Sequence, residues 1–127
     1  HMQELAVYDD LLADILDYFI KKIEQCTKAG IHDIILDPGF GFAKNIHQNF
    51  ELLKKLGTLK MLGKPILAGL SRKSTIYKTL GLTPAEALNG TTVLNTIALL
   101  NGASILRVHD VKEARETIQL IEAYRTT

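Results

Sequence analysis

Short apolar segments alternate with stretches of helical periodicity along the chain, and this alternation constrains the fold more than any other feature. Strands are predicted over Ile34–Leu36, Ile66–Leu70 and Ser104–Val108. Helices are predicted over Tyr8–Lys28, His47–Leu56, Ser74–Leu80, Thr91–Asn101 and Val111–Tyr124, with a capped helical turn at Thr83–Glu86. Because helices separate the strands, we expect the strands to be parallel and joined by helical crossovers.

Three strands are few for a closed parallel architecture. They make a narrow sheet whose two edges need to be covered. A closed (β/α)8 barrel takes about 250 residues, whereas this chain has 127 and opens on a helix. The predicted fold class is therefore α/β, with parallel βα units forming the second half of a TIM (β/α)8 barrel. Residues 3–127 are assigned to this half-barrel as one domain, and His1-Met2 is interpreted as a cloning scar.

Composition and charge exclude several classes of partner. Hydrophobic residues make up 46% and charged residues 23%, as in ordinary globular domains. The net charge of +1 gives no reason to expect nucleic acid or an acidic membrane. No apolar run approaches the roughly 18–20 residues that span a bilayer, and no signal-peptide pattern is present. The single cysteine, Cys26, falls on an apolar helix face, so we expect a buried, unreactive thiol and a cytoplasmic location.

Side chains capable of chemistry gather where the predicted strands end. These side chains are Asp37 after the first strand, Ser71 and Lys73 after the second, and Arg107 and His109 after the third. In parallel βα folds the carboxyl ends of strands face the ligand site. The two-residue period of a strand keeps each pair on one side and points Val108 away. The joint pattern therefore favours a shared small-molecule site, although each residue alone has a structural explanation.

The side-chain types suggest what such a site can bind. A fixed carboxylate at Asp37 accepts two parallel N–H donors, the edge that an amino-pyrimidine ring presents. Lys73 can donate to a ring carbonyl or nitrogen. Arg107 can stack on a flat heterocycle and bind phosphate, and His109 adds a second donor to an anion. Ser71 lies near the start of a helix, where a carboxylate can bind.

Three motifs carry a family resemblance. DPGFGFAKN, GLSRKS and ILRVHDV, in this order and at this spacing, resemble the carboxy-terminal half of the dihydropteroate synthases, the folate-biosynthesis enzymes that sulfonamides target. The resemblance covers essentially the whole chain after His1-Met2. It implies a transferase that condenses 6-hydroxymethyl-7,8-dihydropterin pyrophosphate with p-aminobenzoate, giving 7,8-dihydropteroate and pyrophosphate, with Mg²⁺ on the pyrophosphate.

The resemblance also implies roles for individual residues. By that resemblance, Asp37 binds the amino-pyrimidine edge of the pterin and Lys73 donates to the pterin ring. Arg107 stacks on the pterin and contacts phosphate, and His109 helps to bind the pyrophosphate. Lys73, Arg107 and His109 are accordingly the expected catalytic residues.

The second substrate is expected on the other side of the same site. By the resemblance, Ser71 and the start of the following helix receive the carboxylate of p-aminobenzoate, and Phe42 and Lys44 belong to the loop beside its ring. Arg72 has no assigned role. No residue of this chain is expected to ligate Mg²⁺, because the metal-binding Asn of the family lies in its amino-terminal half.

The family members run to about twice this length, in line with a complete barrel. We therefore expect the chain alone to have little or no synthase activity. Self-association is expected, either as a homodimer through Ser74–Leu100 and Val111–Tyr124 or edge to edge between half-barrels. Two alternatives stay open, namely the pterin-binding domain of a methyltetrahydrofolate methyltransferase and a non-catalytic half-barrel module. The cationic residues argue against the first, because a methyl donor carries no pyrophosphate to neutralise.

Overall fold

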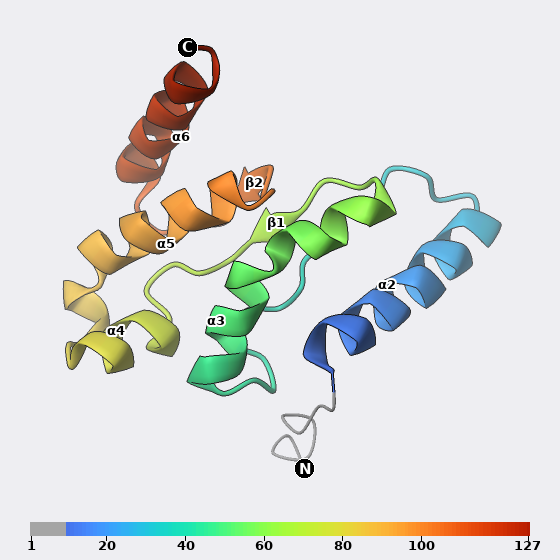
Figure 1. The fold of residues 1–127 in the computed structure, drawn as a ribbon, viewed down its shortest axis with the longest axis horizontal. Helices are drawn as coiled ribbons and strands as arrows, with labels where there is room; N and C mark the ends of the chain where they lie inside the picture. The colour runs from blue at the N-terminus through green and yellow to red at the C-terminus, as the bar shows by residue number, and fades with distance from the viewer. Residues whose placement is uncertain (1–9) are drawn as a thin grey trace.

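The computed structural model describes residues 10–127 (Figure 1). The elements in chain order are α2 (Leu11–Lys28), α3 (Ile46–Lys54), the 3-10 helix η1 (Leu56–Leu62), β1 (Leu67–Ala68), α4 (Ser74–Leu80), the 3-10 helix η2 (Pro84–Glu86), α5 (Leu88–Leu100), β2 (Ile105–Leu106) and α6 (Val111–Arg125). The predicted helix start at Tyr8 and the His1-Met2 pair lie outside the described residues. Within residues 10–127, none of the helices has the length and apolar character needed to cross a membrane.

Parallel pairing links three chain segments. β1 and β2 pair in parallel, with Leu67 opposite Ile105. On the other side of β1, one parallel bridge joins Leu36 to Ile66. The segments therefore lie side by side in chain order and run in the same direction, which confirms the predicted parallel α/β arrangement.

The strands are shorter than predicted. Ile34–Leu36 does not form a strand, since only Leu36 pairs, by donating to the Pro65 carbonyl over 2.9 Å and accepting from the N–H of Leu67 over 2.8 Å. Pro38 follows closely and has no N–H to offer a ladder. β1 also ends early, because the backbone beyond Ala68 enters a turn, in which the N–H of residue 73 donates to the carbonyl of residue 70 over 3.2 Å.

The helices pack in chain order, each against the next. α2 contacts α3 and η1, α3 contacts α4, α4 contacts α5, and α5 contacts α6. Figure 1 shows this order, with α2 and α6 on opposite sides of the molecule and α6 beside α5 alone. Residues fully buried between the helices and the central segments include Phe40, Leu52, Leu56, Leu59, Ile66 and Leu70. The row of helices therefore covers one flank of the parallel segments.

Helix boundaries follow the local sequence closely. α3 begins one residue before its predicted start, where Asn45 and Gln48 form a reciprocal capping box. The capping box predicted at Thr83 and Glu86 is confirmed, although the helix there is a single 3-10 turn. The second predicted helix was extended to Leu56, which instead opens η1.

The prediction of a buried thiol at Cys26 is wrong, because Cys26 is only partly buried. The fully buried positions of α2 are Leu11, Leu12 and Phe19, all in its first half. Cys26 lies near the other end, and none of residues 20–28 is buried. Gly30 follows the end of this helix, with φ of 84° and the preceding residues still hydrogen-bonded to the last turn.

Candidate functional site at the carboxyl ends of the parallel segments

The predicted site residues meet at one edge of the fold. Arg107 Nη1 lies 2.7 Å from Asp37 Oδ2, and Ser71 Oγ lies 2.7 Å from His109 Nδ1. Lys73 reaches across to the first segment and donates its Nζ to the carbonyl of residue 40. Parallel strands bring their carboxyl ends to a common edge, which is why residues so far apart in sequence come together here.

Both oxygens of Asp37 are occupied by donors. Oδ1 accepts the backbone N–H of Gly39 over 2.9 Å, a local turn in which Gly39 has φ of 73°. Oδ2 accepts from Arg107. Partial burial by itself raises the pKa of Asp37, but the hydrogen bonds from Arg107 and Gly39 and the positive charges of Arg107 and Lys73 outweigh it, so the pKa is lowered. The carboxylate is therefore charged and rigidly aimed at neutral pH.

Lys73 lies between the first and third segments. Its Nζ sits 5.8 Å from the centre of the Phe42 ring. Burial lowers the pKa of Lys73, the positive charge of Arg107 lowers it further, and Asp37 partly opposes these effects. Gly41 has φ of 93°, a backbone conformation that a side chain would strain, and a Cβ built there would be in ordinary van der Waals contact with Lys73 Cδ at 3.4 Å. The ammonium is thus held in place by the loop that it supports.

Lys44 stabilises the loop that carries Phe42 by hydrogen bonds to the loop backbone. Its Nζ donates to the carbonyl of Gly39 over 2.9 Å and to that of Phe42 over 3.1 Å. Burial lowers the pKa of Lys44, and the nearby charge of Lys73 lowers it further. Phe42, by contrast, projects from the loop with 66% of its surface exposed. Phe42 is therefore available for a ligand, whereas the Lys44 ammonium is engaged in shaping the loop.

Asn49, which was not recognised from the sequence, also shapes this loop. The residue is 3% exposed. Oδ1 accepts the N–H of Gly41 over 2.7 Å, and Nδ2 donates to the carbonyl of Asn45 over 2.9 Å. A polar residue on the inward face of an otherwise amphipathic helix was the signal that could have revealed it.

Ser71 and His109 contact each other twice. Besides the 2.7 Å contact with Nδ1, Ser71 Oγ accepts the backbone N–H of His109 over 3.2 Å. These residues line an open hollow of about 140 Å³ together with Gly69, Lys73, Arg107 and Val108. Val108 borders this hollow, but the direction of its side chain stays a prediction, and β2 ends at Leu106, before this residue.

A second hollow lies on the other side of Asp37. It has a volume of about 390 Å³ and is open to solvent. Its lining consists of residues from α2 and from the loop that holds Phe42, namely Asp14, Ile15, Tyr18, Phe19, Asp37, Pro38, Gly39, Phe42 and Lys44. Asp37 lines this hollow and Arg107 lines the smaller one, so their ion pair lies between the two.

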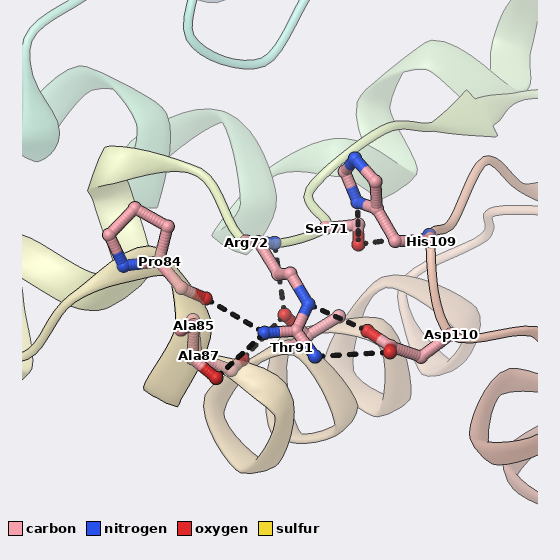
Figure 2. A network of polar contacts seen from close by, with 8 residues as sticks. All are labelled: Ser71, Arg72, Pro84, Ala85, Ala87, Thr91, His109 and Asp110. Carbon is pink, nitrogen blue, oxygen red and sulfur yellow. Dashed lines mark hydrogen bonds and ion pairs between the residues drawn. The ribbon is translucent and has the colours of Figure 1, made fainter.

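Two charged residues beside the site were not recognised from the sequence. Arg72 donates from Nε and Nη2 to the two carboxylate oxygens of Asp110, over 2.9 and 3.0 Å (Figure 2). Asp110 occupies the position before α6, but its side chain makes no capping hydrogen bond. The hydrogen bond and charge of Arg72 lower the pKa of Asp110, while Asp110 raises that of Arg72. Both residues directly adjoin predicted site residues, a signal that could have revealed them.

The described residues do not fit a metal held by the protein. Residues 10–127 contain no group of three or more His, Cys, Asp or Glu side chains that could hold a metal ion. Mg²⁺ prefers oxygen ligands. Of the carboxylates at this edge, Asp37 is bound by Arg107 and Gly39, and Asp110 is bound by Arg72. No step is therefore assigned to a metal on these residues.

A sequence profile of the family described as pterin binding enzyme matches residues 1–109. The chain therefore belongs to the pterin-binding enzyme family. Within that family it is similar to dihydropteroate synthases. It is 45% identical over 124 residues to the dihydropteroate synthase of Escherichia coli K12, an alignment covering 96% of this chain and 44% of that protein. It is 41% identical over 126 residues to the bifunctional dihydropteroate synthase/dihydropteroate reductase of Helicobacter pylori. That alignment covers 99% of this chain and 33% of that protein.

Solved structures agree with this assignment. The Yersinia pestis dihydropteroate synthase in complex with a sulfonamide drug matches with a TM-score of 0.95 and 43% identity, over 99% of this chain and 46% of that one. The Thermus thermophilus enzyme in complex with 4-aminobenzoate matches with a TM-score of 0.91 and 37% identity, over 96% and 50%. The chain thus spans about half the length of the relatives that it matches, and its α/β fold corresponds to part of theirs.

Proposed function

We propose that residues 3–127 form the carboxy-terminal half of a dihydropteroate synthase barrel and contribute residues that bind the pterin, its pyrophosphate and p-aminobenzoate. The observation that carries this proposal is the meeting of Asp37, Lys73, Arg107 and His109 at one edge. The family match and the similarity to dihydropteroate synthases support it. In this proposal the chain condenses 6-hydroxymethyl-7,8-dihydropterin pyrophosphate with p-aminobenzoate only together with the other half of the barrel.

The pterin is proposed to bind at Asp37. Its amino-pyrimidine edge offers two parallel N–H donors, which match a carboxylate whose orientation is already fixed by Gly39. Arg107 donates to one of the two oxygens. The pterin would therefore displace the Arg107 guanidinium, which is free to stack on the ring and to contact phosphate. Lys73 would donate to the ring from the neighbouring segment.

The second substrate is proposed to bind near Ser71 and Phe42. The exposed Phe42 ring offers an apolar surface to the ring of p-aminobenzoate. Ser71, beside the hollow that His109 lines, would receive the carboxylate. Lys44 contributes by holding the Phe42 loop. The Thermus thermophilus relative in complex with 4-aminobenzoate supports this choice of ligand.

The proposed reaction is a substitution at the methylene carbon of the pterin. The bond from this carbon to the pyrophosphate oxygen breaks, and its electron pair leaves with the pyrophosphate. Arg107 and His109 donate hydrogen bonds to the departing anion and stabilise its charge. The lone pair of the p-aminobenzoate amine, which is neutral at pH 7, forms the new C–N bond, and the proton that this nitrogen then loses passes to water, so the attack needs no strong general base. Positioning of the two substrates then accounts for most of the catalysis.

The chain is also proposed to self-associate. An apolar stripe on α5, formed by Val93, Ile97 and Leu100, is 37–49% exposed at each position. Spacings of three and four residues place these side chains on one helix face. A homodimer through α5 and its neighbouring helices would cover this stripe. A cytoplasmic location, where folate precursors are made, remains part of the proposal.

Calorimetry tests the proposed ligands. The purified chain is titrated with a non-hydrolysable pterin pyrophosphate analogue, with p-aminobenzoate and with methyltetrahydrofolate. Binding that requires the pyrophosphate group supports the synthase assignment, whereas preference for methyltetrahydrofolate would support the methyltransferase alternative. Failure to bind any of them would favour a non-catalytic module. In an assay of the chain alone we expect little or no turnover, and a rate near that of a complete synthase would contradict the half-site proposal.

A further inference from the structure

The turn that follows β1 carries an arginine where glycine is usual. The N–H of Lys73 donates to the Leu70 carbonyl over 3.2 Å and closes a four-residue turn. Arg72, its third residue, has φ of 54°. Turns with positive φ at this position favour Gly or Asn, because a side chain is strained there. The side-chain contacts of Arg72 therefore explain its presence better than its backbone does.

The Arg72 side chain and backbone join other segments to this turn (Figure 2). Two parallel hydrogen bonds run from the guanidinium to the carboxylate of Asp110. Nη1 donates to the carbonyls of Pro84 and Ala85, over 2.8 and 3.0 Å. The backbone N–H donates to Thr91 Oγ1 over 3.0 Å. Arg72 thus ties the turn to the loop after β2, to η2 and to α5.

The flanking residues bridge the same two loops. Ser71 precedes Arg72 and contacts His109 through both Nδ1 and the backbone N–H. Asp110 follows His109 directly. The Arg72–Asp110 ion pair and the Ser71–His109 contact are therefore parallel links between the loop after β1 and the loop after β2. Figure 2 shows the two links next to each other.

We propose that Arg72 is a positioning residue. Its ion pair with Asp110, made through two nitrogens, locks the loop after β1 to the loop after β2 and thereby maintains the hydrogen bond between Ser71 Oγ and His109 Nδ1. The lock itself follows from the geometry alone, whereas its effect on pyrophosphate rests on the proposed function. A planar guanidinium can bind a carboxylate with two nitrogens while the third reaches the Pro84 and Ala85 carbonyls. A lysine, a single point donor, cannot make all of these contacts together.

The ion pair also removes a repulsive charge from the neighbourhood of His109. Without Arg72, the Asp110 carboxylate would oppose any anion bound at the adjacent His109. Loss of Arg72 is therefore expected to weaken anion binding through lost geometry and through exposed negative charge. Adding Asp110→Asn to a variant that lacks Arg72 separates these effects, because it removes the negative charge without restoring the lock.

The ¹⁵N resonances of the His109 ring test the lock in the 127-residue chain, because they report hydrogen bonding at Nδ1. Amide exchange at His109 reports its second bond to Ser71. The informative variant is Arg72→Gly, since glycine suits the backbone of this turn. We expect Arg72→Gly to move both signals to the values of Ser71→Ala, in which the partner oxygen is absent, and Arg72→Lys to lie between. Asp110→Asn breaks the pair without altering the turn and is expected to move them in the same direction.

Arg115→Gln is the matched control, because it removes an exposed positive charge from α6 and leaves the turn intact. We expect it to change neither signal. Wild-type ring resonances and amide exchange in the folded Arg72→Gly and Asp110→Asn variants would overturn the lock.

Inorganic pyrophosphate is the probe for the functional consequence. We expect its dissociation constant to rise on the order of tenfold or more in Arg72→Gly, as for other losses of positioning, and to stay raised in Arg72→Gly/Asp110→Asn. Full recovery in the double variant would show that charge alone acts, and would overturn the positioning role. Absence of binding by the wild-type chain would contradict the proposed function instead, and the His109 ring signals would still decide the lock.

Discussion

Arg107 and Asp37 lie 70 positions apart in the sequence, yet Arg107 Nη1 is 2.7 Å from Asp37 Oδ2. Both side chains are partly open to solvent, with 52% and 38% of their surfaces exposed. Ion pairs of this kind contribute about 0–1 kcal/mol, so a ligand can replace Arg107 at small cost. The pair therefore keeps the carboxylate charged and oriented without blocking it.

Replacing Asp37 separates ligand binding from stability. Asp37→Asn is expected to change the free energy of unfolding by about 1 kcal/mol or less, because the lost ion pair is solvent-exposed. The affinity for a pterin pyrophosphate analogue should fall by about tenfold or more, since an amide cannot accept two parallel donors. Denaturant unfolding and calorimetry give the two values. Asp17→Asn, on the exposed face of α2, is the control, and an equal loss of affinity there would contradict the assignment.

The Asp37–Arg107 pair also predicts a pH dependence. The pKa of Asp37 is lower in the folded chain than its ordinary value, so its stabilisation is fully present above the unfolded pKa of about 3.9. It is lost as the pH falls through the lower, folded-state pKa. The stability difference between the wild type and Asp37→Asn should therefore shrink below pH 4. A difference in unfolding free energy that stays constant from pH 6 to the acid limit would be inconsistent with this pairing.

The pKa of Lys73 depends on the charges of Arg107 and Asp37. Burial and the charge of Arg107 lower its pKa, whereas Asp37 raises it. Arg107→Gln should therefore raise the pKa of Lys73, and Asp37→Asn should lower it further, as measured by ¹³C NMR titration of its Cε. The two variants serve as controls for each other because their expected shifts have opposite signs. Shifts of the same sign would show that Lys73 does not lie between these two groups.

Because Gly69 has no side chain, it leaves the space that the Arg107 guanidinium occupies. A Cβ at Gly69 would come within 2.3 Å of Arg107 Nη2 and 2.8 Å of Cζ. Because the obstructed group is the end of a flexible side chain, Gly69→Ala should change stability by about 1 kcal/mol or less while moving the guanidinium away from Asp37. Denaturant unfolding gives the change in stability, and the NMR signals of Arg107 Nε report the displacement of the guanidinium. Gly57→Ala, whose added carbon would meet only the Asn101 carbonyl at 3.5 Å, should leave both at their wild-type values.

Periodicity was enough to predict where the α-helices lie and the edge at which the site residues meet, although α5 begins at Leu88 and not at Thr91, and Leu56–Leu62 forms a 3-10 helix. The helical stretch over Ser74–Leu80 is observed with those bounds. Asp37, Lys73 and Arg107 were predicted to converge because each lies at the carboxyl end of an apolar segment, and helices separate these segments along the chain. That inference depends on chain direction alone, which is the same for all parallel segments.

The contacts that set the detailed geometry could not be predicted in this way. Arg72 and Asp110 are separated by 38 positions, and their pairing depends on a turn with positive φ at Arg72. Asp110 matched the pattern of a helix cap, because aspartate is favoured before a helix whatever its side chain contacts. The alternation applied to Val108 likewise extends beyond the point where β2 ends.

The most direct test of the account is an NMR titration of the ¹⁵N-labelled chain with a non-hydrolysable pterin pyrophosphate analogue. The account predicts that the backbone signals of Gly39, Lys73, Arg107 and His109 shift together and give one dissociation constant, because all four belong to a single site. Separate dissociation constants for the Gly39 and His109 signals, or shifts confined to other parts of the chain, would contradict it.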